Sequence, residues 1–182
     1  MVKIFWILRA LLYKPFFGKF GIISYIGKPL FIKGSRRIFI GKNVRIFPQL
    51  RIEVHHKGKI IINDNVAIGQ NVHITSASNL SIGENSTILA NTFITNIDHD
   101  YSEIDKHILD QKMIINETII GENCFIGIGV AIQAGTILGK QCIVGSNSVV
   151  RGHFPDYSVI VGSPAKIVKK YNFETNRWEK IK

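Results

Sequence analysis

Aliphatic residues recur at every sixth position along much of this chain. Between residues 114 and 150 the series is unbroken and runs Ile114, Ile120, Ile126, Ile132, Leu138, Val144, Val150. Shorter series precede it and run Ile40, Ile46, Ile52, then Ile62, Ile68, Ile74, then Ile82, Ile88, Ile94. Residues six apart point to the same side of an extended chain, and six is not a helical period. The pattern therefore predicts a parallel β-helix, in which each coil buries its apolar edge on the next.

The series stops at Ile94 and resumes at Ile114, and the segment between them is polar. Residues 98–113 read DHDYSEIDKHILDQKM, with two histidines and five acidic residues. A long loop inside a regular repeat is more often functional than decorative. We therefore expect this loop to carry reactive or selective side chains.

The N-terminal region combines a predicted helix with an uneven distribution of charge. A helix over residues 2–14 places six apolar residues on one broad face, namely Ile4, Phe5, Ile7, Leu8, Leu11 and Leu12. Residues 1–52 contain 11 Lys or Arg and no acidic residue, so the formal charge of +10 belongs to this part of the chain. Two compatible interpretations follow: a cap on the open end of the β-helix, or a contact with a membrane surface.

The remaining features favour a single cytoplasmic domain over 1–182. The apolar run at 4–12 is too short to span a bilayer, and we find no signal-peptide cleavage site. Basic residues interleaved with apolar ones suit lipid better than nucleic acid. We expect an N-terminal segment (1–29), the β-helix (30–153) and a C-terminal tail (154–182). Pro155 and Pro164 oppose further repeats, so the tail is expected to form a short helix or an extended wrap.

Cys124 and Cys142, 18 residues apart, are predicted to stack as core residues rather than to form a disulfide or a metal site.

Three stretches resemble the hexapeptide-repeat acyltransferases. They are IGENSTILANTFITNIDHD (82–100), IGENCFIGIGVAIQAGTILGKQCIVGSNSVV (120–150) and FPDYSVIVGSPAKIVKK (154–170). The chain looks most like the sugar O-acetyltransferases of that family, which include maltose, galactoside and nodulation-factor enzymes and bacterial polysaccharide O-acetyltransferases. The resemblance implies an all-β, left-handed parallel β-helix, a homotrimer with active sites between subunits, and acetyl-CoA as acyl donor with no metal. It also implies five coils, at about 40–59, 62–81, 82–113, 114–131 and 132–149.

Within this resemblance His99 is the expected general base. It aligns with the catalytic histidine of the family, and a neutral imidazole titrates near working pH, so it suits removal of a proton from a hydroxyl. A neighbouring carboxylate or carbonyl is expected to hold its tautomer. The candidate acceptor-binding residues around it are Asn96, Asp98, Asp100, Tyr101 and His107.

The resemblance also assigns contacts to acetyl-CoA. Phe125 stands where relatives often carry tryptophan, which implies an aromatic wall for the acetyl and pantetheine end. Three further positions are expected to line the pantetheine groove, namely Gly127, Ile128 and Ser146. Three basic positions are expected to meet the CoA phosphates, namely Arg151, Lys166 and Lys169, because opposite charge suits a polyphosphate.

We therefore expect an acetyl-CoA-dependent O-acetyltransferase that modifies a sugar hydroxyl in a bacterial surface polysaccharide, such as lipopolysaccharide, or in its lipid-linked precursor. Two alternatives stay open: an N-acetyltransferase of an amino-sugar nucleotide, which shares the fold, donor and histidine, and a non-catalytic β-helix scaffold. A zinc-dependent carbonic anhydrase on a similar coil needs three convergent histidines, and the spacing of the six histidines here does not favour it.

Overall fold

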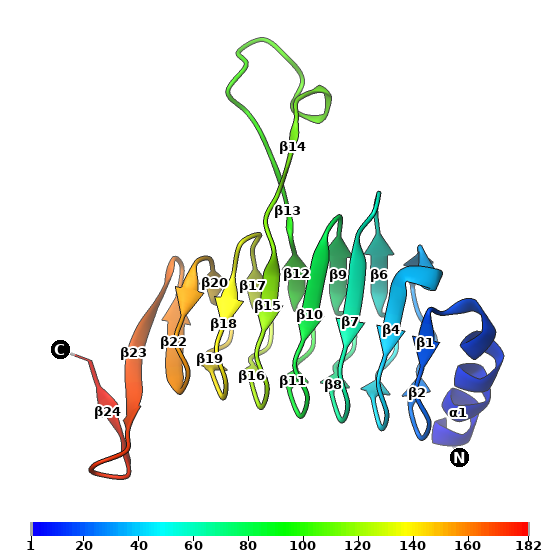
Figure 1. The fold of residues 1–182 in the computed structure, drawn as a ribbon, viewed down its shortest axis with the longest axis horizontal. Helices are drawn as coiled ribbons and strands as arrows, with labels where there is room; N and C mark the ends of the chain where they lie inside the picture. The colour runs from blue at the N-terminus through cyan, green and yellow to red at the C-terminus, as the bar shows by residue number, and fades with distance from the viewer. Residues whose placement is uncertain (1, 182) are drawn as a thin grey trace.

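The computed structural model describes residues 2–181 as a left-handed parallel β-helix. As the chain advances from its N-terminal end, strands on the near side run downward and strands on the far side run upward, which is left-handed winding (Figure 1). The predicted all-β architecture of stacked coils is thus confirmed.

Three parallel sheets form the faces of the prism, and each full coil gives one strand to each sheet. Sheet A contains β1 (Lys19–Phe20), β4 (Ile38–Ile40), β7 (Lys59–Ile62), β10 (Asn79–Ile82), β15 (Thr118–Ile120), β18 (Ile137–Leu138) and β21 (His153–Phe154). Sheet B contains β2 (Tyr25–Ile26), β5 (Arg45–Ile46), β8 (Ala67–Ile68), β11 (Thr87–Ile88), β16 (Phe125–Ile126), β19 (Ile143–Val144), β22 (Ser158–Gly162), β23 (Ala165–Asn172) and β24 (Arg177–Lys180). Sheet C contains β3 (Phe31–Lys33), β6 (Arg51–Val54), β9 (His73–Ser76), β12 (Phe93–Thr95), β17 (Ala131–Ile132) and β20 (Val149–Val150).

The six-residue spacing produces the core because each aliphatic anchor lies over the same anchor of the next coil. In sheet A, for example, Ile62 pairs with Ile40 on one side and with Ile82 on the other. These three side chains are at most 1% exposed. Complete burial of an isoleucine stabilises the fold by about 1.5–3 kcal/mol, so the stacked anchors are the main source of stability.

The β-helix is longer at both ends than predicted. Its strands begin at Lys19, and six full coils are followed by a seventh that has only β21 and β22. The predicted β-helix segment (30–153) and the five predicted coils (about 40–149) were therefore both too short. The missed coils follow the same rule, since Phe20, Ile26 and Ile32 are six apart and so are Phe154 and Ile160. Pro155 does not end the repeat, because it lies in a turn and β22 pairs with β19 beyond it.

One anchor of the sequence pattern is misleading. Ile114 keeps the six-residue spacing but lies in β14 (Met113–Ile115), where it pairs with Asp98 of β13 (Ile97–His99) and is 38% exposed. The core series resumes only at Ile120, which is 1% exposed.

A polar ladder runs along the corner between sheets A and B. The second corner residue of successive coils has a positive φ, as at Asn43, Asn65 and Asn85, and asparagine tolerates this backbone conformation. The amide of Asn43 donates to Asn65 at 3.0 Å, and that of Asn65 donates to Asn85 at 2.8 Å. In the first coil the same corner holds Ile23, with a φ of 61°.

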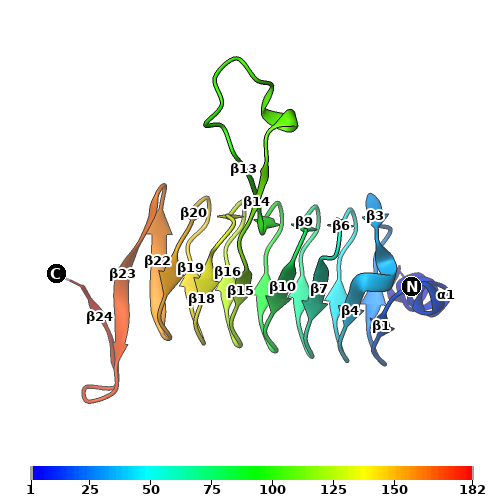
Figure 2. The ribbon, with the colours of Figure 1, turned by 45° about the horizontal axis from the view of Figure 1, so that its top comes forward.

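Helix α1 (Val2–Tyr13) lies across the N-terminal end of the β-helix, followed by the short 3-10 helix η1 (Lys14–Phe16) (Figures 1 and 2). A second 3-10 helix, η2 (Ser35–Arg37), precedes β4. Arg9 donates to the Ile26 carbonyl, Ala10 is buried, and Trp6 packs on Tyr25. The six apolar residues of the predicted helix face, in contrast, are 47–71% exposed. Within residues 2–181 no helix is long and apolar enough to cross a membrane.

The tail is extended, which is one of its two predicted forms; the other was a short helix. After the Ser163–Pro164 bond, which is cis, β23 returns antiparallel to β22 and β24 returns antiparallel to β23. Both cysteines are free and buried, as predicted, and they precede the paired residues Phe125 and Ile143 in adjacent coils.

Candidate functional site

The interrupting loop is an arm that stands away from the prism. It leaves the corner between sheets C and A as the antiparallel pair β13–β14, and both views show it projecting from the middle of the β-helix (Figures 1 and 2). All residues from 101 to 110 are exposed, including the short 3-10 helix η3 (Ile108–Asp110). The side chain of Gln111 closes the arm on itself through hydrogen bonds to Glu103 and Lys106.

The base of the arm is anchored by Asn96, which is completely buried. Its Oδ1 accepts from the Ala77 N–H at 2.9 Å, and its Nδ2 donates to the hydroxyls of Ser76 at 3.0 Å and Ser78 at 2.9 Å. This burial contradicts the prediction that Asn96 binds the acceptor. The residue instead fixes the point at which the chain leaves the coil, three positions before His99.

His99 ends β13 and lines a groove of about 370 Å³ on sheet C. The groove is lined by Arg51, Glu53, His55, His73, Thr75, Phe93, Thr95, Ile97, His99 and Met113. The Nδ1 atom of His99 is buried and has no hydrogen-bond partner among residues 2–181. Its other ring nitrogen, Nε2, is therefore the one that can exchange a proton with a molecule in the groove.

The carboxylates beside His99 are used by other groups. Asp98 accepts from the His99 backbone N–H at 2.9 Å and from Arg151 Nη2 at 2.7 Å. Asp100 accepts from the Ser102 N–H at 2.9 Å, which holds the pKa of this carboxyl below its usual range. Neither carboxylate forms a hydrogen bond or ion pair with the imidazole, so among residues 2–181 the expected tautomer partner is not supplied. Arg151 thus forms an ion pair between the β20–β21 corner and the arm, and its contact with the CoA phosphates stays a prediction.

Tyr101 and His107, predicted to contact the acceptor, lie on the exposed part of the arm. Tyr101 is 78% exposed, and the His107 Nδ1 accepts from the Leu109 N–H at 3.2 Å, where it caps η3. Neither residue lines the groove that contains His99.

Glu53 is a site residue that the sequence reading missed. It is 8% exposed, accepts from Arg51 Nε at 2.5 Å and contacts His73 Nε2 at 3.3 Å and His55 Nε2 at 3.6 Å. Burial raises the pKa of Glu53, but the hydrogen bonds and charges of Arg51 and His73 outweigh it and lower the pKa overall.

Burial, followed by the charge of Arg51, lowers the pKa of His73. The described residues hold no group of three His, Cys, Asp or Glu side chains arranged to bind a metal ion. Strand register could have located this cluster, because Arg51, His73 and Phe93 pair in one outward row of sheet C.

Three of the seven predicted acetyl-CoA residues lie on sheet B, namely Phe125, Lys166 and Lys169. Phe125 pairs with Ile143, Ile143 pairs with Val159, and Val159 pairs with Lys169. This outward row therefore spans three strand spacings of about 4.8 Å each, or about 14 Å from Phe125 to Lys169. Lys166 lies in the same strand and is exposed.

The three predicted pantetheine positions occupy the corner between sheets B and C. Ile128 is 48% exposed, Ser146 is exposed, and Gly127 is buried with its N–H donated to the Val144 carbonyl. One chain thus holds His99 over sheet C and Phe125 on sheet B, on different faces of the prism.

Sequence and structure comparisons agree with this architecture. A family model for bacterial transferase hexapeptide repeats matches residues 117–152, and one for the hexapeptide repeat of succinyl-transferase matches residues 59–96. The putative lipopolysaccharide biosynthesis O-acetyl transferase WbbJ of Escherichia coli is 35% identical over 94% of this chain and 89% of its own length. A probable acetyltransferase of Mycobacterium tuberculosis, Rv3034c, is 33% identical over 93% of this chain, which spans 57% of that protein.

Among solved structures, a variant of AntD, an N-acyltransferase from Bacillus cereus, superposes with a TM-score of 0.79 at 20% identity, over 92% of this chain and 90% of that one. This likeness supports the fold. The identity to WbbJ along nearly the full length of both chains goes further, and it shows that the chain belongs to the bacterial hexapeptide-repeat acetyltransferases.

Proposed function

We propose that this protein transfers the acetyl group of acetyl-CoA to a hydroxyl of a sugar. The observation that carries the proposal is the His99 imidazole, which lines a groove on sheet C and has its Nδ1 buried. Membership of an acetyltransferase family, and the name of the WbbJ relative, support the reaction and the sugar acceptor.

His99 acts as the general base. With Nδ1 buried, its Nε2 is the ring nitrogen left to take the proton of the acceptor hydroxyl as the oxygen attacks, which makes a poor nucleophile reactive. Hydroxyls of the acceptor are bound by the polar groups of the groove, and Glu53 offers a buried carboxylate as hydrogen-bond acceptor. After the transfer the imidazolium can return its proton to the departing thiolate.

The residues present fit acetyl-CoA as donor. When bound, it supplies an acyl carbon already activated as a thioester, whose C–S bond breaks as the new C–O bond forms. Phe125 and Ile128 are exposed apolar side chains suited to the pantetheine end, and Lys166 and Lys169 place positive charge further along sheet B for the phosphates. The solved AntD relatives contain coenzyme A, which supports the same donor here.

A homotrimer completes the site in this proposal. His99 and Phe125 lie on different faces of one prism, so a second copy has to bring its sheet B to the groove of the first. The arm supports such a contact, because its Tyr101, Ile104 and Leu109 are 68–82% exposed in the single chain.

For the acceptor we propose a glycan of the bacterial surface or its lipid-linked precursor, modified at the cytoplasmic face of the plasma membrane. The exposed apolar face of α1 supports peripheral contact with that membrane. N-acetylation of an amino sugar is the second candidate, favoured by the AntD complex with dTDP-4-amino-4,6-dideoxyglucose. Offering one sugar in hydroxyl and amine forms would separate the two reactions.

The base is tested by His99→Ala, with His107→Ala as a control in the same arm. We expect His99→Ala to lower kcat by about 10²–10⁴-fold while acetyl-CoA affinity, measured by calorimetry, stays nearly constant. The control should keep most of its activity. A mild loss for His99→Ala would assign the proton transfer to another group.

A further inference from the structure

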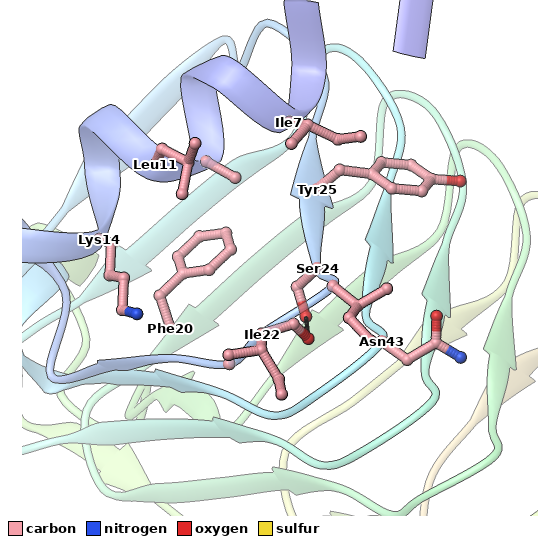
Figure 3. Close-up of a pocket in the computed structure, with 11 residues that line it drawn as sticks. Ile7, Leu11, Lys14, Phe20, Ile22, Ser24, Tyr25 and Asn43 are labelled. Atoms are coloured by element: carbon pink, nitrogen blue, oxygen red, sulfur yellow. Dashed lines mark hydrogen bonds between the residues drawn. The ribbon is translucent and has the colours of Figure 1, made fainter. Parts of the chain in front are cut away.

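A second cleft lies at the N-terminal end of the β-helix, between α1 and the first coil. It has a volume of about 460 Å³ and is lined mainly by aliphatic and aromatic side chains, with Lys14 at its edge. Figure 3 shows Leu11 on the helix above Phe20 of the coil, and Ile7 beside Tyr25. The cleft therefore presents an apolar interior beside a cation.

The lower wall of this cleft departs from the pattern of the other coils. At the corner between sheets A and B the later coils carry polar pairs, such as Lys42–Asn43 and Asp64–Asn65. The first coil carries Ile22 and Ile23, which are 59% and 79% exposed. Ile23 also adopts a φ of 61°, which is strongly disfavoured for a β-branched side chain. Apolar side chains held in a strained backbone and exposed to water indicate a binding surface.

Charge indicates the kind of partner. No acidic residue occurs before Glu53, and Lys3, Lys14 and Lys19 are exposed on or beside the helix. The outward face of α1 is itself apolar, with Leu8 and Leu12 51% and 71% exposed. An apolar cleft, an apolar helix face and an excess of cations together match a lipid with an anionic headgroup.

We propose that this cleft binds one acyl chain of an anionic phospholipid, with Lys14 beside the lipid phosphate. This inference rests on the proposed peripheral membrane contact and adds to it a discrete site for a single lipid. In the bound state the chain covers Ile22 and Ile23, which accounts for two isoleucines at a corner that later coils make polar. The helix then lies in the interfacial plane with its exposed leucines toward the bilayer.

The test uses the full-length protein and two probes. The first is short-chain phosphatidylglycerol below its micelle concentration, titrated by calorimetry, which reports a single-lipid site. The second is sedimentation with vesicles of equal parts phosphatidylcholine and phosphatidylglycerol, which reports membrane contact as a whole.

The variant is Ile22→Lys with Ile23→Asn, which copies Lys42–Asn43 from the next coil and so suits the corner conformation. We expect saturable binding of one short-chain lipid to the unaltered protein, weakened by about tenfold or more in this variant. Its added lysine would strengthen purely electrostatic adsorption, so weaker binding points to the cleft. The control Leu12→Lys lies outside the cleft and should weaken vesicle binding while keeping the short-chain site.

Four results would overturn the proposal. Unchanged lipid binding by the double variant would place the lipid elsewhere. Vesicle binding without any short-chain binding would leave membrane contact but remove the discrete site, whereas failure of both probes would remove the membrane contact as well. A double variant that changes its sedimentation mass while lipid binding stays constant would show that a second copy covers the cleft.

Discussion

Replacement of Asn96 by alanine should destabilise the fold severely for a single substitution. The amide is completely buried and is the acceptor of the Ala77 N–H. Leaving that N–H unpaired costs about 1–3 kcal/mol, and each lost hydrogen bond from Nδ2 adds about 0.5–1.5 kcal/mol. The hydroxyl of Ser76 keeps its bonds to the Lys59 and Ser78 carbonyls, which limits the second contribution. We therefore expect a loss of about 2–4 kcal/mol, a large part of the 5–15 kcal/mol typical of a folded domain.

Urea unfolding followed by circular dichroism, at equal protein concentrations, measures this loss. Asn79→Ala is the matched control, since Asn79 is exposed in the adjoining strand and its replacement should change stability by less than about 0.5 kcal/mol. The kcat of Asn96→Ala should also fall, because His99 lies three residues beyond the anchor. A destabilisation below about 1 kcal/mol would refute the reasoning, as it would mean that water replaces the amide in this corner.

Three further outcomes follow from the site and core. Arg151→Ala should lower kcat and leave the KM for acetyl-CoA unchanged, because this side chain pairs with Asp98 of the arm. A raised KM would show that Arg151 contacts the CoA phosphates. The pKa of His73 is lowered in the folded state, so the stability that depends on a neutral His73 is complete above the unfolded pKa of about 6.5 and is lost as pH falls toward the folded pKa. His73→Gln should therefore make the urea midpoint fall less steeply on acidification. An equally steep fall would disprove this. Cys124 and Cys142, 2% and 0% exposed, should react with a thiol reagent only after unfolding, and fast labelling of the native protein would contradict their burial.

The fold was predictable because its cause is local and periodic. Every coil repeats one requirement, an aliphatic residue on the inward side of each face, and that requirement is visible in one sequence. The same simplicity led to one error, since Ile114 keeps the period while lying in an antiparallel pair outside the core. Periodicity records which side of a strand a residue occupies, but it cannot record when the chain leaves the coil.

The site was predictable only in part, because it depends on contacts between distant segments. His99 could be found from its place in a family motif. The burial of Asn96 and the pairing of Asp98 with Arg151, 53 residues away, depend on the angle at which the arm leaves the prism. Glu53 was missed because it lies in an ordinary coil two turns before the arm, and only the stacking of β6, β9 and β12 brings it under His99.

The hairpin formed by β23 and β24 has a consequence for how copies of this protein can associate. A stack of coils is a template for its own lengthening, since an uncovered terminal coil offers parallel edges to the first coil of another molecule. Here sheet B ends in the antiparallel hairpin β23–β24 instead of an open coil, and helix α1 lies across the opposite end of the β-helix. The hairpin and the helix oppose head-to-tail joining of prisms into a fibre and leave the flanks for closed assemblies of defined size.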